Sequence, residues 1–189
     1  VILQVHPKAL ELGGTALIAL CLEAGRTSSV PVAVHLDHCS SPQIIDTALQ
    51  AGISSVMADG SHLPYEENIL FTKKIIASAR SLGRSVEAEL GQLSGSEDGY
   101  TVAQYEACLT HPDQAADFVQ KTGVDTLAVC IGNVHGTYSA APQLDFKRLE
   151  AIGQRVSIPL VLHGTSGLPD KMIQQSIARG VVKFNINTE

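Results

Sequence analysis

Several features that define special classes of protein are missing from this chain of 189 residues. No apolar stretch approaches ~20 residues, so the sequence predicts no transmembrane helix and no membrane partner. The 13 Lys and Arg are scattered without a basic run and the net charge is −6, which argues against a nucleic-acid partner. The 4 cysteines show no CxxC spacing, which is more typical of reduced thiols in an intracellular protein than of a disulfide framework or a zinc ribbon. We therefore expect a cytoplasmic globular protein.

No low-complexity segment or linker divides the chain, so residues 1–189 are expected to form a single domain. What the chain does contain is a series of apolar runs typical of strands, whose starts recur roughly every 30 residues. Such βαβ units have parallel strands, and their uninterrupted series favours an α/β fold of the (β/α)8 TIM-barrel type over a doubly wound sheet. The seven runs are residues 1–5, 31–37, 54–59, 85–90, 126–132, 159–164 and 181–187.

A complete barrel has eight strands and typically ~250 residues, so the chain is expected to be a fragment. A strand before Val1 and a helix after Glu189 are the expected omissions. Ser41 followed by Pro42 predicts the beginning of a helix. Four glycines predict the ends of helices, namely Gly52, Gly83, Gly123 and Gly180.

Polar side chains collect where these strands end. Asp37 and His38 close the second run, His135 follows the fifth and His163 lies at the end of the sixth. In a parallel barrel the strand ends converge on one face, where three imidazoles suit a catalytic Zn²⁺ with an open fourth position. A single histidine at a strand end is more often a hydrogen-bonded structural residue. The three together favour the zinc site.

The remaining histidines and Cys39 are expected to be structural. His35 lies deeper in its strand, which favours a buried role, and His62 and His111 precede prolines or helix starts, where capping or solvation suffices. Cys39 follows His38 and could be a metal ligand, although a small apolar filler is the commoner use of such a residue.

Two segments at strand ends have the composition of anion sites. HGTSG (163–167) precedes a helix, so its N–H groups and hydroxyls could hold a phosphate, and NINTE (185–189) would do the same after the last strand. Ordinary helix caps are the alternative for both. The long gap at 91–112 suits a mobile flap that could deliver Glu97 or Asp98, with a plain solvated acidic loop as its alternative.

These residues form motifs that resemble the class II, zinc-dependent ketose-bisphosphate aldolases, a family that includes fructose- and tagatose-bisphosphate aldolases. The resemblance covers essentially the whole chain in the right order and identifies residues 1–5 as similar to the family's second barrel strand and 181–187 as similar to its eighth. The motifs are HLDH (35–38), DGSHLPYEENI (59–69), EAELG (87–91), GSEDG (95–99), IGNVHG (131–136), LHGTSGLP (162–169) and KFNINTE (183–189).

The resemblance implies a role for each candidate residue. One catalytic Zn²⁺ would be bound by His38, His135 and His163, and Asp37 would transfer the proton. Glu97 would be the loop acid, and Asp59 with Glu89 could take a second or displaced metal. A monovalent cation, Na⁺ or K⁺, is also expected near the phosphate. The dihydroxyacetone-phosphate moiety would be held by Gly136, Gly164, Thr165, Ser166, Asn185, Ile186, Asn187 and Thr188.

The implied activity is the reversible aldol cleavage of a ketose phosphate or bisphosphate to dihydroxyacetone phosphate and an aldehyde, by a homo-oligomeric lyase of carbohydrate metabolism. Cleavage leaves a carbanion, which Zn²⁺ stabilises as an enediolate, and Asp37 would take the C4 hydroxyl proton. His6 departs from the family pattern, since fructose-bisphosphate aldolases often carry a Ser there, and LSGS (93–96) stands where consecutive glycines are common.

Three other functions compete with this one. A Schiff-base aldolase could use Lys183, which lies in a strand, but it would make the three histidines redundant. A metallohydrolase would be expected to show an HxH pair, and the sequence contains none. A catalytically inactive or regulatory sugar-phosphate-binding domain of a larger protein also fits, although every predicted catalytic position is filled.

Overall fold

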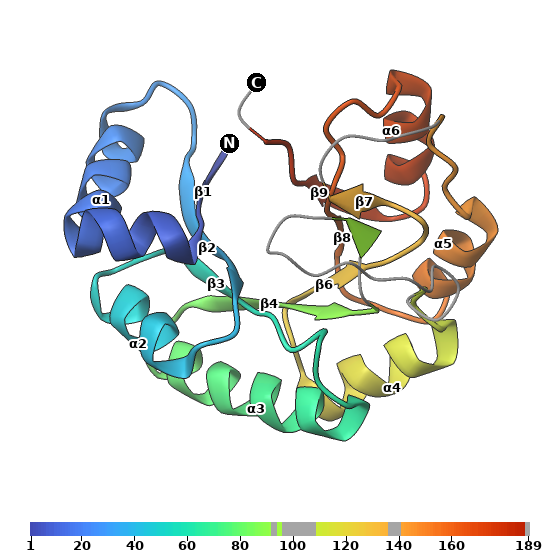
Figure 1. Ribbon diagram of the computed structural model, residues 1–189, viewed down its shortest axis with the longest axis horizontal. Helices are drawn as coiled ribbons and strands as arrows, with labels where there is room; N and C mark the ends of the chain where they lie inside the picture. The colour runs from blue at the N-terminus through green and yellow to red at the C-terminus, as the bar shows by residue number, and fades with distance from the viewer. Residues whose placement is uncertain (92–93, 96–108, 136–140, 188–189) are drawn as a thin grey trace. The chain divides into compact units, whose positions relative to one another are not determined.

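The computed structural model describes residues 1–91, 94–95, 109–135 and 141–187 (Figure 1). Among the predicted site residues, Glu97, Gly136 and Thr188 lie outside the described residues. The chain forms two compact units, unit 1 (Val1–Ala88) and unit 2 (Glu89–Glu189), each with its own strands and helices. The assignment of residues 1–189 to a single domain stays a prediction.

Unit 1 is a parallel sheet whose strands follow their order in the sequence, β1-β2-β3-β4. One face of these strands is apolar and fully buried, as Leu36, Val56 and Val86 show. The helices that separate the strands contact this sheet. The elements are β1 (Ile2–Val5), α1 (Pro7–Thr27), β2 (Ala33–Cys39), α2 (Pro42–Gln50), β3 (Ser55–Ala58), α3 (Tyr65–Ser81) and β4 (Ser85–Leu90), whose last two residues belong to unit 2.

Unit 2 repeats the strand–helix alternation, with β6, β8 and β9 paired in parallel. Two very short strands, β5 and β7, pair in parallel in a separate sheet that was not expected from the sequence. The core contains Phe118, Leu127 and Leu160, each 1% exposed or less. The elements are β5 (Ser94–Gly95), α4 (Pro112–Thr122), β6 (Thr126–Val129), β7 (Val134–His135), α5 (Phe146–Gly153), β8 (Leu160–Leu162), α6 (Asp170–Ile177) and β9 (Val181–Phe184).

The predicted fold class is confirmed: seven parallel strands alternate with helices, as in a fragment of a TIM barrel. Each predicted strand run overlaps one of these strands. The Ser41 side chain caps α2 by accepting a hydrogen bond from the Ile44 N–H at 3.4 Å. The four glycines predicted to end helices all have positive φ angles. Within the described residues, none of the helices is both long enough and apolar enough to cross a membrane.

Candidate active site

The end of β2 carries a β-bulge that contains His38. Leu36 pairs with Val56 and Cys39 pairs with Ala58, so β2 takes three steps where β3 takes two. His38 has a φ of 43°, the left-handed region that residues other than glycine rarely adopt. A regular strand sends adjacent side chains to opposite faces, and a bulge breaks that alternation. The directions of the Asp37 and His38 side chains are therefore set by the bulge as well as by the pleat.

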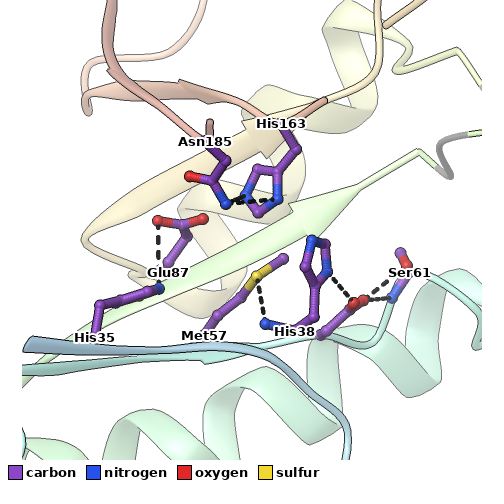
Figure 2. Close-up of polar contacts among 8 residues, drawn as sticks. His35, His38, Met57, Ser61, Glu87, His163 and Asn185 are labelled. Atoms are coloured by element: carbon purple, nitrogen blue, oxygen red, sulfur yellow. Dashed lines mark hydrogen bonds and ion pairs between the residues drawn. The ribbon is translucent and has the colours of Figure 1, made fainter. Parts of the chain in front are cut away.

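A carboxylate at the end of β3 holds the His38 ring. Nδ1 of His38 lies 2.8 Å from Oδ2 of Asp59, and the other Asp59 oxygen accepts hydrogen bonds from Ser61, from the hydroxyl at 2.7 Å and from the N–H at 3.1 Å (Figure 2). Burial alone would raise the pKa of the Asp59 carboxyl. The hydrogen bond and charge of His38, with the Ser61 bonds, outweigh burial and hold that pKa well below its usual range.

This pair has the form of a carboxylate–imidazole couple that orients a metal ligand. A carboxylate on one ring nitrogen fixes the tautomer and makes the other nitrogen a better donor to a metal. With Nδ1 of His38 facing Asp59, Nε2 is the atom through which this ring would bind a metal. The His38 N–H also donates to the sulfur of Met57 at 3.4 Å, a contact that the sequence did not predict.

A second group of polar side chains lies on β2 and β4 and consists of His35, Asp37 and Glu87. His35, Asp37 and Glu87 each offer one ligand atom, and these atoms lie within 4.8 Å of one another. His35 and Glu87 are each 2% exposed, so the burial predicted for His35 is confirmed. Nδ1 of His35 lies 2.7 Å from the Ser55 hydroxyl, and Nε2 lies 3.9 Å from a Glu87 carboxylate oxygen (Figure 2).

In unit 2, His163 follows β8 and is completely buried. The amide nitrogen of Asn185 lies 3.0 Å from Nδ1 of the His163 ring (Figure 2). The buried Asn133 side chain donates to the His163 carbonyl at 3.0 Å and accepts from the Ile131 N–H at 2.9 Å. The His163 ring and backbone are thus both held by neutral amides.

The second histidine of unit 2, His135, lies beside His163. Their ring centroids are 6.0 Å apart and the ring planes are inclined by 23°. The backbones also meet closely, because a Cβ at Gly164 would overlap the carbonyl oxygen of Val134 and lie 2.6 Å from its carbonyl carbon. Gly164 has a φ of +60°, so both space and conformation require glycine between His163 and Thr165.

The two predicted anion segments of unit 2 are joined by hydrogen bonds. Thr165 donates to the Asn185 carbonyl from its N–H at 3.2 Å and from its hydroxyl at 2.8 Å. The Asn187 N–H donates to the Ser166 hydroxyl at 2.9 Å. Ile186, between them, is 66% exposed. The structure therefore brings the segments after β8 and β9 together, as the sequence suggested.

A model of the class-II fructose-bisphosphate aldolase family matches residues 1–189 of this chain. The chain belongs to this family. It is 45% identical to the D-tagatose-1,6-bisphosphate aldolase subunit GatY of Klebsiella oxytoca over all 189 residues, which cover 66% of that protein. The chain thus spans slightly less than two thirds of this relative.

Solved structures of aldolases share the fold. The YdjI aldolase of Escherichia coli K12 is 39% identical, with a TM-score of 0.83 over 98% of this chain and 65% of its own. The fructose-bisphosphate aldolase of Campylobacter jejuni is 25% identical, with a TM-score of 0.80 over 98% of this chain and 64% of its own. The family resemblance inferred from the motifs is confirmed.

The remaining candidate residues of this class II aldolase chain have simpler surroundings. His111 accepts a hydrogen bond from the Asp113 N–H at 3.3 Å and caps α4, as predicted, and His6 caps α1 in the same way. Burial raises the pKa of the Cys39 thiol, which suits an apolar filler. Glu89 is 2% exposed, whereas Lys183 is only partly buried.

Sequence reasoning also missed the contacts that Ser55 and Asn133 make with His35 and His163. Asn133 follows a predicted strand, which marks it as a strand-end polar residue, but its bond spans 30 residues to His163. Ser55 begins β3, and its contact with His35 spans 20 residues. Only the parallel pairing of β2 with β3 could have indicated the Ser55 contact in advance.

Proposed function

We propose that the protein containing this chain is a metal-dependent aldolase that reversibly cleaves a ketose phosphate or bisphosphate into dihydroxyacetone phosphate and an aldehyde. The observation that carries the proposal is the carboxylate–imidazole couple of Asp59 and His38, found beside Asp37 in a chain of the class II aldolase family. The similarity to a tagatose-bisphosphate aldolase subunit favours a ketose bisphosphate as substrate.

His38, His135 and His163 are the proposed ligands of one catalytic Zn²⁺. The donor set fits, because imidazole suits zinc and three protein ligands leave a position for substrate. The Asp59 contact supports His38, and the close approach of the His135 and His163 rings supports the other two. When bound, Zn²⁺ supplies Lewis-acid polarisation of a substrate oxygen. A second or displaced metal at Asp59 and Glu89 is also part of the proposal.

Asp37 is the proposed acid/base residue. In the cleavage direction its carboxylate would take the proton of the C4 hydroxyl, and in the condensation direction it would return that proton. Its position next to His38 supports this role, since the base and the metal ligand must serve neighbouring atoms of one substrate. Glu97 is proposed to exchange the C3 proton.

The phosphate of the dihydroxyacetone-phosphate moiety is proposed to bind at the joined segments after β8 and β9. The bonds from Thr165 to Asn185 and from Asn187 to Ser166 support this, because they hold two polar segments in one place. A Na⁺ or K⁺ ion is proposed near this phosphate. The residues are Gly136, Gly164, Thr165, Ser166, Asn185, Ile186, Asn187 and Thr188.

The test is an assay of the intact protein on a panel of ketose monophosphates and bisphosphates, with and without chelator. We expect cleavage of a bisphosphate that chelator abolishes and added zinc restores. Asp37→Ala should lower turnover by roughly 10²–10⁴-fold with zinc still bound, the usual worth of a positioned acid or base. His163→Ala should lose zinc.

Two results would contradict this function. Activity that survives chelator but is lost after borohydride trapping would indicate a Schiff base at Lys183 instead. Binding of sugar phosphates by the intact protein without any cleavage would indicate the regulatory domain.

A further inference from the structure

His35 lies beneath the proposed acid/base residue on the same face of unit 1. His35 precedes the bulge in β2 and Asp37 lies within it, yet one ligand atom each from His35, Asp37 and Glu87 lie within 4.8 Å of one another, so the three side chains meet on one side of the sheet. Ser55 is paired with His35 in register on β3, and Glu87 is paired with Met57 two positions further along. Residues in register share a face, as do residues two positions apart in a regular strand, so His35, Ser55 and Glu87 lie on one face of β2, β3 and β4.

The surroundings of the His35 ring indicate where its proton lies. A neutral imidazole carries one N–H and one lone pair. Nε2 lies 3.9 Å from a Glu87 carboxylate oxygen, and an Asp37 oxygen belongs to the same group of atoms within 4.8 Å. A lone pair on Nε2 facing the Glu87 carboxylate would be repelled, so the N–H belongs on Nε2. Nδ1 then accepts a hydrogen bond from the Ser55 hydroxyl at 2.7 Å.

We propose that His35, held in this tautomer by Ser55, is a positioning residue that orients the Asp37 carboxylate for proton transfer. The inference rests on the proposed role of Asp37. The Asp37 carboxylate can rotate about two side-chain bonds. The His35 ring, with a ligand atom within 4.8 Å of an Asp37 oxygen, attracts that oxygen through its N–H and favours the rotations that bring it closer. Transfer needs donor and acceptor within hydrogen-bond distance, so this restriction acts on the reaction step itself. Because His35 and Glu87 are buried in unit 1 and the partly buried Ser55 holds the other ring nitrogen, the ring is fixed before substrate arrives.

The experiment uses the intact, zinc-loaded enzyme and changes one hydroxyl at a time. Ser55→Ala removes the group that selects the tautomer, and Ser55→Thr keeps it. Ser54→Ala is the matched control, because the neighbouring Ser54 hydroxyl accepts a hydrogen bond from the Val34 N–H at 3.1 Å instead of contacting His35. Each variant is also made in the Asp37→Ala background. Turnover, the solvent deuterium isotope effect on kcat, and zinc content are measured for all.

We expect Ser55→Ala to lower kcat about 10-fold and His35→Leu about 10–100-fold, the usual cost of removing an outer-shell partner. The solvent isotope effect should rise in both, because a misplaced carboxylate makes proton transfer more rate-limiting. Ser55→Thr and His35→Gln, whose amide offers an N–H in place of Nε2–H, should recover most of the loss. In the Asp37→Ala background, Ser55→Ala should cost nothing further.

Three results would overturn the inference alone. One is the same loss in both backgrounds, which marks a structural role. Another is an equal loss in Ser54→Ala. The third is a second zinc ion that His35→Gln removes, which would make the group a metal site. Near-normal turnover in Asp37→Ala alone would instead remove the proposed acid/base role and this inference with it.

Discussion

The two units hold their histidines by different means. In unit 1, the His38 side chain is 13% exposed and its ring contacts the anionic carboxylate of Asp59 at 2.8 Å. In unit 2, His163 is fully buried, its ring contacts the neutral amide of Asn185 and its carbonyl accepts from the neutral amide of Asn133. One histidine is placed mainly by charge and the other mainly by packing and neutral hydrogen bonds.

This difference predicts which kind of substitution each histidine tolerates. A carboxylate partner makes an imidazole a stronger donor, so removing the charge at Asp59 should weaken metal binding more than folding. A neutral amide network and a close backbone approach add no charge, so disturbing them in unit 2 should weaken folding more than metal affinity.

Gly164→Ala should produce the largest effect. The new methyl group would overlap the Val134 carbonyl and force a residue with a side chain to adopt a φ of +60°. Overpacking and backbone strain together should cost about 3 kcal/mol or more of unfolding free energy, measured by urea denaturation of the intact protein. Gly167→Ala is the control. Its φ of +74° imposes a similar backbone strain, but a Cβ at Gly167 would have no atom within 4 Å apart from its chain neighbours. Equal losses of unfolding free energy in the two variants would show that the close approach of Gly164 to the Val134 carbonyl does not affect stability.

Asp59→Ala should come next and act on the metal. Removing the carboxylate beside Nδ1 of His38 should weaken zinc binding about 10–100-fold, measured by competition with a chromophoric chelator. Asp59→Asn keeps an acceptor oxygen without the charge, so its zinc affinity should lie between that of Asp59→Ala and that of the unaltered protein. If Asp59→Ala bound zinc as tightly as the unaltered protein, the charge of Asp59 would not be what distinguishes His38 from His163.

Asn133→Ala should have a smaller effect, and this effect should fall on stability and not on zinc affinity. The change removes the donor to the His163 carbonyl and the acceptor for the Ile131 N–H, both buried. The unfolding free energy should fall by about 1–2 kcal/mol, while the zinc affinity of the folded protein changes little. A large loss of affinity with no loss of stability would reverse the contrast between the units.

Ser61→Ala should have the smallest effect. It deletes the hydroxyl that donates to Asp59 at 2.7 Å and leaves the Ser61 N–H bond in place. Zinc affinity should fall by an amount equivalent to about 1 kcal/mol or less, measured by the same competition assay. Ser41→Ala is the control, since it removes the α2 cap and should lower stability without changing zinc affinity.

The strands and helix ends of both units could be predicted because they depend on local patterns. β4 occupies the predicted residues 85–90, and the other strands overlap their predicted runs with ends that differ by a few residues. Glycine at helix ends and Ser41 at a helix start follow from backbone sterics and hydrogen bonding within one turn.

Other features depend on how many residues each strand contributes, which a local pattern does not encode. The alternation of Val32, Val34 and Leu36 predicts a regular strand, yet the extra residue at the end of β2 appears only when β2 is aligned with β3. The Asn133 and Ser55 contacts likewise join residues 30 and 20 positions apart. The candidate residues could therefore be named from the sequence, but their supporting partners could not.

The bulge in β2 has a consequence for grafting and recombination between related barrels. Leu36 and Cys39 are anchored to Val56 and Ala58, so the number of residues between those anchors decides how the intervening side chains leave the strand. A donor segment with the same residues but one fewer position would restore strict alternation and redirect His38. Residues 36–39 must therefore be exchanged as a block together with the facing stretch of β3.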